Sequence, residues 1–469
     1  MSEKKSSFVK AGALYTVGNI LVKGLGFLSI PIFTRLMLPE DYGVYNVFMS
    51  YAAVVTIIVN VAFHTNLKNY KFDYPDDFEK YSATCFFLAY FGSAVLFLLT
   101  CGFTFFNLVN ISYFLITFIA LESLAQACVT YYVSYLSLKV KTTSYLVISL
   151  LYSVSSILLS VYLIKSGFFE TAAKNRILGV VIPNLLVAFY ITNIFRKNTN
   201  FARIKEYLKY GFKISLPLLP HAFAQIILSQ FDRMMISEMD SFASAGIYSF
   251  AFNVSSILLI VASSCDTAWE PWFFEKMSTE KYDEIKRNSK IYSVFFLMLA
   301  VGLVFISPEI ATLLAPEEYA ESVYSAIPLI GAAFFLFMYY LPSGIEYFLK
   351  KTAYISIGTV SAAVLNIVLN YFTIKFYGYK AAAFTTSFCY VLYFIFHVLM
   401  AKKLIGVEKF NMILDIKYLL IICAAFVGMS FFALMFVDNI IVRWLVMSAV
   451  CCPAALYCYK KYRVIKEYN

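Results

Sequence analysis

The chain alternates long apolar stretches with short polar breaks over its whole length, and this pattern constrains its fold more than any other feature. About fourteen stretches reach the roughly 20 apolar residues that a helix needs to cross a bilayer. They cover residues 11–36, 44–66, 81–101, 111–136, 144–165, 177–195, 214–236, 245–268, 291–309, 324–348, 352–375, 381–401, 418–437 and 439–458. With 61% hydrophobic and 14% charged residues, against about 25% charged in soluble domains, the sequence predicts an all-α polytopic membrane protein.

The basic residues lie mainly in alternate breaks. Most of the 38 Lys and Arg residues fall on one side, and the longest basic breaks are 196–213 and 273–290, whereas the breaks on the other side are short and often acidic. The positive-inside rule makes the basic side cytoplasmic and places both termini inside. The net charge of +10 then reflects topology and the anionic lipid surface, so no nucleic-acid partner is expected.

The two halves of the chain resemble each other. Residues Thr34 to Tyr45, at the first break, are similar to Asp232 to Tyr248, and Leu163 to Gly167 is loosely similar to Thr373 to Gly378. Six stretches per half put both halves in the same orientation, an arrangement of parallel repeats that is typical of alternating-access transporters. The expected divisions are an N-terminal six-helix bundle (1–195), a basic cytoplasmic linker (196–213), a C-terminal six-helix bundle (214–403) and an additional helix pair with a cytoplasmic tail (404–469).

Several motifs, spread in order over nearly the whole chain, carry a family resemblance. They are the segment from Pro31 to Gly43 (PIFTRLMLPEDYG), Leu208 to Gly211 (LKYG), Leu216 to His221 (LPLLPH) and Leu365 to Asn370 (LNIVLN). Together they resemble the polysaccharide flippases, which are the O-antigen and capsule repeat-unit transporters of the multidrug/oligosaccharidyl-lipid/polysaccharide (MOP) superfamily. The motifs are specific for the family but not for a particular sugar.

This resemblance implies a V-shaped pair of six-helix bundles plus a helix pair, and a transporter that is not an enzyme. Such flippases move an undecaprenyl-diphosphate-linked oligosaccharide from the inner to the outer leaflet of the bacterial cytoplasmic membrane, for O-antigen, capsule or exopolysaccharide. A cationic central cavity receives the substrate, and related members use H⁺ or Na⁺ as coupling ion. Membrane lipids and a polysaccharide polymerase are the other expected partners, and neither a cofactor nor a metal is expected.

A diphosphate that crosses hydrocarbon needs cations in a water-accessible cleft, so cations within the membrane are the candidate substrate-binding residues. Lys23 lies near the middle of the first stretch, where a lysine costs roughly 2.5–3.5 kcal/mol unless it meets water or a partner. An ion pair with Glu122 is the alternative for Lys23. Arg35 and Arg233 take corresponding places in the two halves, and guanidinium groups can hold phosphate oxygens in bidentate fashion. Snorkelling to the interface, with Asp232 neutralising Arg233, is the alternative for these two.

Three further cations are candidates on weaker grounds. Lys165 and Arg176 lie on the outer side between the fifth and sixth stretches, against the charge rule, where an exit path for an anionic glycan and plain surface exposure are both open. Lys213 begins the seventh stretch, where it could meet the incoming headgroup or simply determine topology.

The ion-coupling candidates are Glu122, Asp232 and His221, because burial makes the protonation of carboxylates and histidines sensitive to their surroundings. Glu346 belongs to the same wider group, and His397 is interpreted as a packing histidine. Asn366 and Asn370, four residues apart on one helix face, are expected to bond to a neighbouring helix first and to contact glycan second.

Two rival functions stay open. One is another exporter of the same fold, either a flippase for a peptidoglycan lipid precursor or a multidrug antiporter. The other is a membrane-embedded glycan polymerase or ligase, which the short outer connections disfavour.

Overall fold

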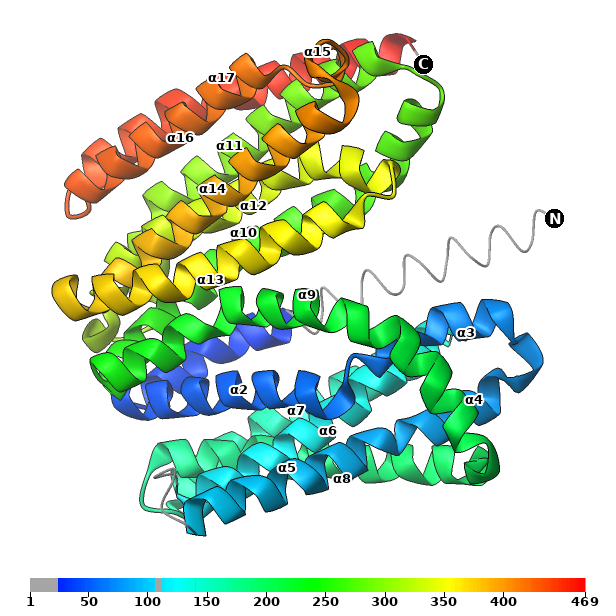
Figure 1. Cartoon of the computed structure of the whole chain (residues 1–469). Helices are drawn as coiled ribbons and strands as arrows, with labels where there is room; N and C mark the ends of the chain where they lie inside the picture. The colour runs from blue at the N-terminus through cyan, green and yellow to red at the C-terminus, as the bar shows by residue number, and fades with distance from the viewer. Residues whose placement is uncertain (1–23, 106–111, 140, 469) are drawn as a thin grey trace. The chain divides into compact units, whose positions relative to one another are not determined.

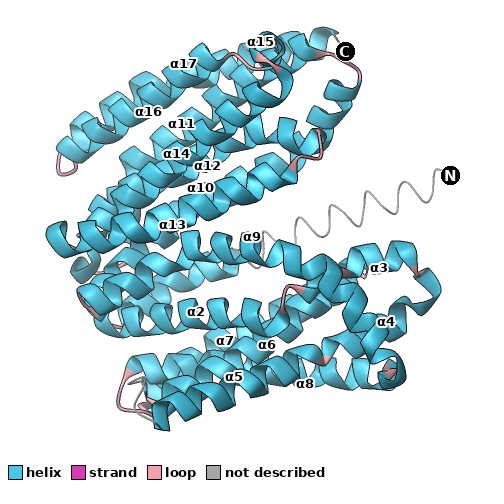
Figure 2. Cartoon of the chain, viewed as in Figure 1, coloured by secondary structure: helices cyan, strands magenta, loops and turns pink. Residues whose placement is uncertain are grey.

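The computed structural model describes residues 24–105, 112–139 and 141–468, and in these ranges the chain contains helices and no strand (Figure 2). Thirteen of the helices are long and apolar enough to cross a membrane. The first expected stretch, 11–36, is described only from Gly24 on, as the shorter apolar helix Gly24–Leu36. The prediction of an all-helical polytopic membrane protein is therefore confirmed.

Contacts divide the chain into two compact units, Met1–Met234 and Met235–Asn469. In the N-terminal unit, α6 packs against α2, α5, α7 and α8, and α7 packs closely along α8 (Figure 1). The helices after Gly24–Leu36 are α2 (Pro39–Asn60), α3 (Leu67–Asp73), α4 (Phe78–Phe86), α5 (Leu88–Phe105), α6 (Tyr113–Leu138), α7 (Thr142–Ser166), α8 (Ala172–Phe195) and α9 (Ile204–Met239), which continues beyond the unit.

In the C-terminal unit, α12 is the central helix, and it is nearly all buried because α10, α11, α13, α14 and α16 pack around it. The helices are α10 (Phe242–Ser278), α11 (Tyr282–Leu314), α12 (Ser322–Phe348), α13 (Thr352–Tyr377), α14 (Ala381–Ile405), α15 (Val407–Ile413), α16 (Ile416–Met435) and α17 (Ile440–Tyr468). The expected additional helix pair corresponds to α16 and α17.

The helix α7 shows how the sequence suits a membrane. One face, three or four residues apart, exposes large apolar side chains: Val147, Leu151, Val154, Leu158 and Tyr162. The opposite face carries serines that point into the unit, among them the fully buried Ser160. A helix that is apolar outside and polar inside is stable only where lipid and not water surrounds it.

Two breaks expected from the sequence are shorter than predicted. Only residues 279–281 separate α10 from α11, so most of the expected break 273–290 is helical. In the same way, α9 begins at Ile204 inside the expected linker 196–213. Helix formation needs backbone hydrogen bonds and not an apolar sequence, so polar residues extend the helices past the apolar stretches.

Most of α9, up to Met234, belongs by contacts to the N-terminal unit, so the contact division falls later than the expected linker. The buried Asn66 side chain donates to Ser215 Oγ at 3.0 Å and accepts from Tyr81 Oη at 2.8 Å. The rings of Phe63 and Phe212 pack edge to face, with centroids 5.1 Å apart. The division into two six-helix bundles at 214 stays a prediction.

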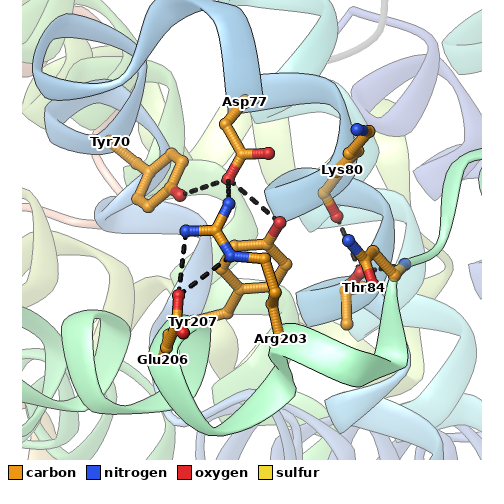
Figure 3. A network of polar contacts seen from close by, with 8 residues as sticks. Tyr70, Asp77, Lys80, Thr84, Arg203, Glu206 and Tyr207 are labelled. Atoms are coloured by element: carbon orange, nitrogen blue, oxygen red, sulfur yellow. Dashed lines mark hydrogen bonds and ion pairs between the residues drawn. The ribbon is translucent and has the colours of Figure 1, made fainter.

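A polar network fixes the start of α9 (Figure 3). Asp77 Oδ2 accepts hydrogen bonds from Tyr70 Oη at 2.9 Å, from Tyr207 Oη at 3.0 Å and from Arg203 Nη1 at 3.0 Å. Arg203 Nε also donates to Glu206 Oε2 at 2.9 Å. Burial, together with the bond to Asp77, raises the pKa of Tyr70, so this phenol stays a donor at physiological pH.

Ion pairs near both ends of α11 attach the last helix pair, α16 and α17, to it. Arg443 of α17, which is buried, makes a bidentate pair with Glu309, with Nη1–Oε2 and Nη2–Oε1 distances of 2.7 and 2.8 Å. Toward the other end, Asp415 contacts Lys290 of α11 and also accepts from the backbone N–H of Tyr418, which caps α16. The bond from Lys290 holds the pKa of Asp415 below its ordinary value.

This shift predicts a pH-dependent stability. Because the folded-state pKa of Asp415 is depressed, its charge stabilises the fold above the unfolded-state value of about 3.9, and this stabilisation is lost as pH falls through the folded-state pKa. Asp415→Asn keeps an oxygen that can cap α16 but removes the charge that pairs with Lys290. We therefore expect the free energy of unfolding to fall by about 0.5–1 kcal/mol near neutral pH. Thermal unfolding of the purified chain in detergent over a pH series measures it.

Asp438→Asn is the matched control, because Asp438 is exposed on the turn between α16 and α17. The difference between Asp415→Asn and the unchanged chain should shrink in acid below about pH 4. An equal loss in both variants would contradict the assigned role of Asp415.

Candidate functional site: a polar cavity in the N-terminal unit

A cavity of about 420 Å³ lies inside the N-terminal unit, within the range of small-molecule sites. Three helices contribute most of the polar side chains that line it, at helical spacing. These are Glu122, Gln126 and Thr130 from α6, Tyr152, Ser153, Ser156 and Ser160 from α7, and Arg176 and Asn184 from α8. Phe33, Tyr45 and Met49 complete one wall. The cavity is therefore polar although the bundle around it is apolar outside.

Glu122 is the buried acid of this cavity, with 0% of its surface exposed. Its Oε1 accepts from Asn184 Nδ2 at 2.8 Å and from Gln126 Nε2 at 3.0 Å. Both partners are neutral amides, so they stabilise the carboxylate by hydrogen bonds without neutralising its charge. Its second oxygen, Oε2, has no partner among the described residues.

Arg176 is the buried cation of the cavity. Its guanidinium lies between two aromatic rings, 3.8 Å from the Phe33 centroid and 3.7 Å from the Tyr45 centroid, with the Tyr42 ring at 5.1 Å. Cation–π contacts of this kind stabilise a charge where water is excluded, by about 2 kcal/mol when desolvated. Two stacked faces leave the edge of the guanidinium as the part that can donate hydrogen bonds.

The motif from Pro31 to Gly43, together with Tyr45 just after it, builds this cage. Phe33, Tyr42 and Tyr45 stack around Arg176, and Met37 Sδ lies 3.6 Å from its Nη1. Asp41 Oδ1 accepts from the Ala173 backbone N–H at 3.1 Å, at the start of α8, where a carboxylate is favourable. The motif therefore positions α8 and its arginine.

The cavity has both donors and acceptors to offer. Arg176 Nε, Ser156 Oγ, Asn184 Oδ1 and Glu122 Oε2 are buried atoms without hydrogen-bond partners among the described residues. Buried polar atoms are usually paired, because an unpaired one costs about 1–3 kcal/mol. Ligand phosphate oxygens would accept from Arg176 Nε and Ser156 Oγ, whereas ligand hydroxyls or a cation would satisfy the acceptor oxygens of Asn184 and Glu122.

The backbone of α8 is shaped to lie close to α7. A Cβ at Gly179 would lie 2.5 Å from Ser160 Cα, so only glycine allows this approach. Pro183, one turn further along, sits inside α8 next to Asn184 and removes one backbone hydrogen bond. These two residues therefore help to direct Asn184 toward Glu122.

The predicted substrate-binding cations occupy different surroundings. Lys23 lies outside the described residues, so its contacts are not described. Arg176 is 8% exposed, so the alternative of plain surface exposure is wrong for it: α8 begins at Ala172, and the residue lies inside that helix. Lys165 and Lys213 are exposed.

The two arginines of the sequence repeat differ in burial. Arg35 is exposed, and its Nη1 donates to the Pro31 carbonyl at 2.9 Å, whereas Arg233 is 7% exposed and donates to Gln230. Gln230 in turn accepts from Ser50 Oγ at 3.1 Å. In the division of the chain by contacts, both arginines belong to the N-terminal unit. Their role in substrate binding stays a prediction.

The coupling candidates also differ. Of the three, Glu122 lines the cavity, Asp232 is buried in α9, and His221 is partly buried with Nε2 3.4 Å from Gln225 Nε2. Among the described residues, no group of three or more His, Cys, Asp and Glu side chains could hold a metal ion.

The expectation for Asn366 and Asn370 is confirmed. Asn366 Nδ2 donates to Thr386 Oγ1 of α14 at 3.0 Å, and Asn370 accepts from Thr385 Oγ1 of the same helix. These bonds join α13 to α14.

Sequence reasoning missed most of the cavity lining. Gln126, Asn184 and the serines of α7 were not named, although their spacing carried a signal: Gln126 follows Glu122 by four residues, and Ser156 precedes Ser160 by four. Polar residues at helical spacing within apolar stretches mark an inward face. What the spacing could not show is that three such faces meet.

Gly179 offers a test of the packing around the cavity. Gly179→Ala places a methyl group against the backbone of α7, so we expect the helices to separate and the fold to lose about 1–3 kcal/mol. Gly102→Ala in α5 is the control, because a Cβ there meets nothing within 4 Å. Thermal unfolding in detergent measures both, and equal stability of the two variants would contradict the close approach.

Comparison with known proteins identifies the family of the chain. The model of the family described as "Polysaccharide biosynthesis protein" matches residues 8–277. The chain is 21% identical over 400 residues to "Lsg locus putative protein 1" of Haemophilus influenzae, a match that covers 82% of this chain and 97% of the relative.

Solved structures show the same fold. The structure "Lipid II flippase MurJ, inward closed conformation" has a TM-score of 0.63 and 16% identity, covering 96% of this chain and 99% of its own. An inward-facing multidrug resistance MATE family transporter of the MOP superfamily has a TM-score of 0.56 and 14% identity, covering 85% and 99%. With a family match over more than half of its length, the chain belongs to the Polysaccharide biosynthesis protein family, and it is a multi-pass membrane protein with the fold of these MurJ and MATE structures.

Proposed function

We propose that this chain is a flippase that moves a polyprenyl-diphosphate-linked oligosaccharide repeat unit from the inner to the outer leaflet of the bacterial cytoplasmic membrane, with both termini cytoplasmic. The observation that carries the proposal is membership of a polysaccharide biosynthesis family in a chain whose fold is that of membrane transporters. The relative with the highest TM-score quoted above is itself named a lipid flippase.

The cavity of the N-terminal unit supports the same substrate class. A flippase must hold a polar headgroup away from hydrocarbon while the apolar tail stays in the bilayer, so it needs a polar interior inside an apolar bundle. The cavity meets this need with a buried arginine and a row of hydroxyl and amide groups. Its volume of about 420 Å³ suits part of a glycan headgroup and leaves no room for a prenyl tail.

In this proposal Arg176 binds the anionic or most oxygen-rich part of the headgroup through its guanidinium edge, while Phe33 and Tyr45 hold its two faces. Asn184 and the α7 serines bind sugar hydroxyls. Glu122 is the first choice as the coupling residue for H⁺ or Na⁺, because its unpaired Oε2 lies in the same cavity. Lys23, Arg35, Arg233, Lys165 and Lys213, with Asp232 and His221, remain candidates elsewhere on the path.

The experiment that tests the function is depletion of the protein in its host, followed by an assay of lipid-linked oligosaccharide on each membrane leaflet. Completed single units should accumulate on the cytoplasmic leaflet. If single units reach the outer leaflet normally and only their polymerisation or transfer stops, the chain is not the flippase and an enzymatic role replaces it.

Arg176→Gln tests the role of the buried cation. The substitution removes a charged donor while keeping an amide of similar reach. We expect the binding free energy of the headgroup to weaken by about 1.5–3 kcal/mol, which corresponds to a transport rate lower by roughly 10- to 100-fold. The side-resolved assay in depleted cells, at matched protein levels, measures it. Arg196→Gln is the matched control, since Arg196 is an exposed arginine at the other end of α8. Equal transport in both variants would show that Arg176 only stabilises the bundle.

A further inference from the structure

A carboxylate and a histidine meet in the interior of the C-terminal unit. Glu346 of α12 and His397 of α14 are both 0% exposed, and His397 Nδ1 lies 2.8 Å from Glu346 Oε1. One atom of each, Glu346 Oε2 and His397 Nε2, has no hydrogen-bond partner among the described residues. The pair therefore makes one bond and keeps two unused polar atoms in a dry place.

Three helices enclose the imidazole. The rings of Tyr339 and Tyr393 lie 4.7 Å from it, and Tyr393 Oη is 2.9 Å from Thr359 Oγ1 of α13. A Cβ at Gly358 of α13 would lie 2.7 Å from His397 Nε2, so the bare backbone of a glycine allows α13 to close this side.

Counting charges shows how many protons the pair holds. With one proton shared, as carboxylate and imidazolium or as carboxylic acid and imidazole, the pair is neutral. Without it, a carboxylate is buried with no cation, and with a second proton an imidazolium is buried with no anion in contact. Either uncompensated charge costs several kcal/mol in a dry interior. The closed arrangement is therefore stable with one proton.

Among the described residues no cationic side chain is found in contact with the pair, and Lys350 and Lys351, which follow α12, are exposed. The titratable groups near the pair are Tyr339 and Tyr347 of α12, Tyr393 of α14, and Asp266 and Glu270 of α10. The neighbouring residues Gly358 and Thr359 of α13 do not titrate. None of these groups is a cation, so they disfavour a bare carboxylate further.

A small cavity offers a path for the proton. It measures about 190 Å³, and Asp266, Glu270, Tyr339, Ser343 and Tyr347 are among the residues that line it. Tyr339 borders this cavity on one side and the ring of His397 on the other. Tyr339 is therefore the side chain that lies between the cavity and the pair.

We propose that Glu346 and His397 form a proton-binding site of the C-terminal unit, which holds one proton while α12, α13 and α14 are closed and exchanges it through the cavity beside Tyr339. Because the proton leaves only when water can reach the two charged groups, proton release and the opening of these helices favour each other. Coupling of this event to substrate transport rests on the function proposed above, whereas proton binding itself does not.

The first test observes the pair directly in the unchanged chain. When the proton lies between Nδ1 and Oε1, His397 Nε2 carries a hydrogen. When a carboxylic-acid hydrogen lies on Oε2, Nδ1 donates to Oε1 and Nε2 is bare, as it also is in a pair that has lost its proton, so nitrogen and infrared spectra are read together. The chain has three histidines, so ¹⁵N-histidine spectra of the purified protein in lipid nanodiscs are tractable. His64→Gln and His221→Gln identify the other two signals, and His397 is then assigned without being changed.

We expect the two spectra together to show the neutral pair in the purified chain, with either a hydrogen on His397 Nε2 or a protonated Glu346. A bare Nε2 without a carboxylic-acid band from Glu346 would show a purely structural hydrogen bond and overturn the proposal. Infrared spectra of Glu346→Gln decide where the proton lies, because only a protonated Glu346 gives a carboxylic-acid band that this variant lacks.

The second test concerns coupling. In proteoliposomes containing a polyprenyl-diphosphate-linked oligosaccharide, we expect an imposed pH gradient to alter flipping by the unchanged chain. In Glu346→Gln this dependence should fall by about 5- to 150-fold, the usual range for coupling between two sites. Glu318→Gln, the same change at an exposed position, is the control.

The outcomes separate the two proposals. A gradient dependence that is equal in Glu346→Gln and Glu318→Gln would overturn the coupling role of the pair. Absence of flipping by the unchanged chain, at any gradient, would contradict the proposed function alone, and the histidine spectra would still decide whether the pair binds a proton.

Discussion

The scarcity of water inside a membrane protein is the constraint on which this structure depends. A polar side chain within the bundle has to find its partner in the protein, because hydrocarbon offers none and an unpaired polar group is costly. The chain meets this constraint in three ways. Arg176 is stacked between rings, Glu122 is bonded to two amides, and Glu346 is paired with His397.

The buried polar groups of the chain differ in what they leave unsatisfied. Asn366 and Asn370 bond to threonines of the neighbouring helix, and this arrangement joins α13 to α14. Around Arg176 and Glu122, in contrast, donors and acceptors remain unpaired beside a cavity of about 420 Å³. Unpaired polar atoms next to open space are consistent with a site that binds a ligand, whereas fully paired ones are consistent with a structural contact.

The family motif also has a physical interpretation. Read as a sequence, the segment from Pro31 to Gly43 is only a short apolar pattern, but in the fold three of its side chains, Phe33, Met37 and Tyr42, surround the guanidinium of Arg176. A fourth, Asp41, holds the start of α8. The segment is therefore tied to a residue more than 130 positions away, as the separation of 139 between Met37 and Arg176 shows. In this chain, residues that carry the family resemblance therefore also form part of the candidate site.

The sequence by itself determined the class of fold, because the length and apolar character of each stretch leave membrane-spanning helices as the physically acceptable structure. It also pointed to Glu122 and to the Asn366–Asn370 contact, since a polar residue inside an apolar stretch needs a partner. It could not decide that Arg176 is buried, because that depends on where α8 begins and on aromatic rings from helices more than 130 residues earlier in the chain. It gave no reason to connect Glu346 with His397, which are 51 residues apart and belong to different helices. Periodicity shows which face of a helix is polar, but only tertiary packing decides which polar faces meet.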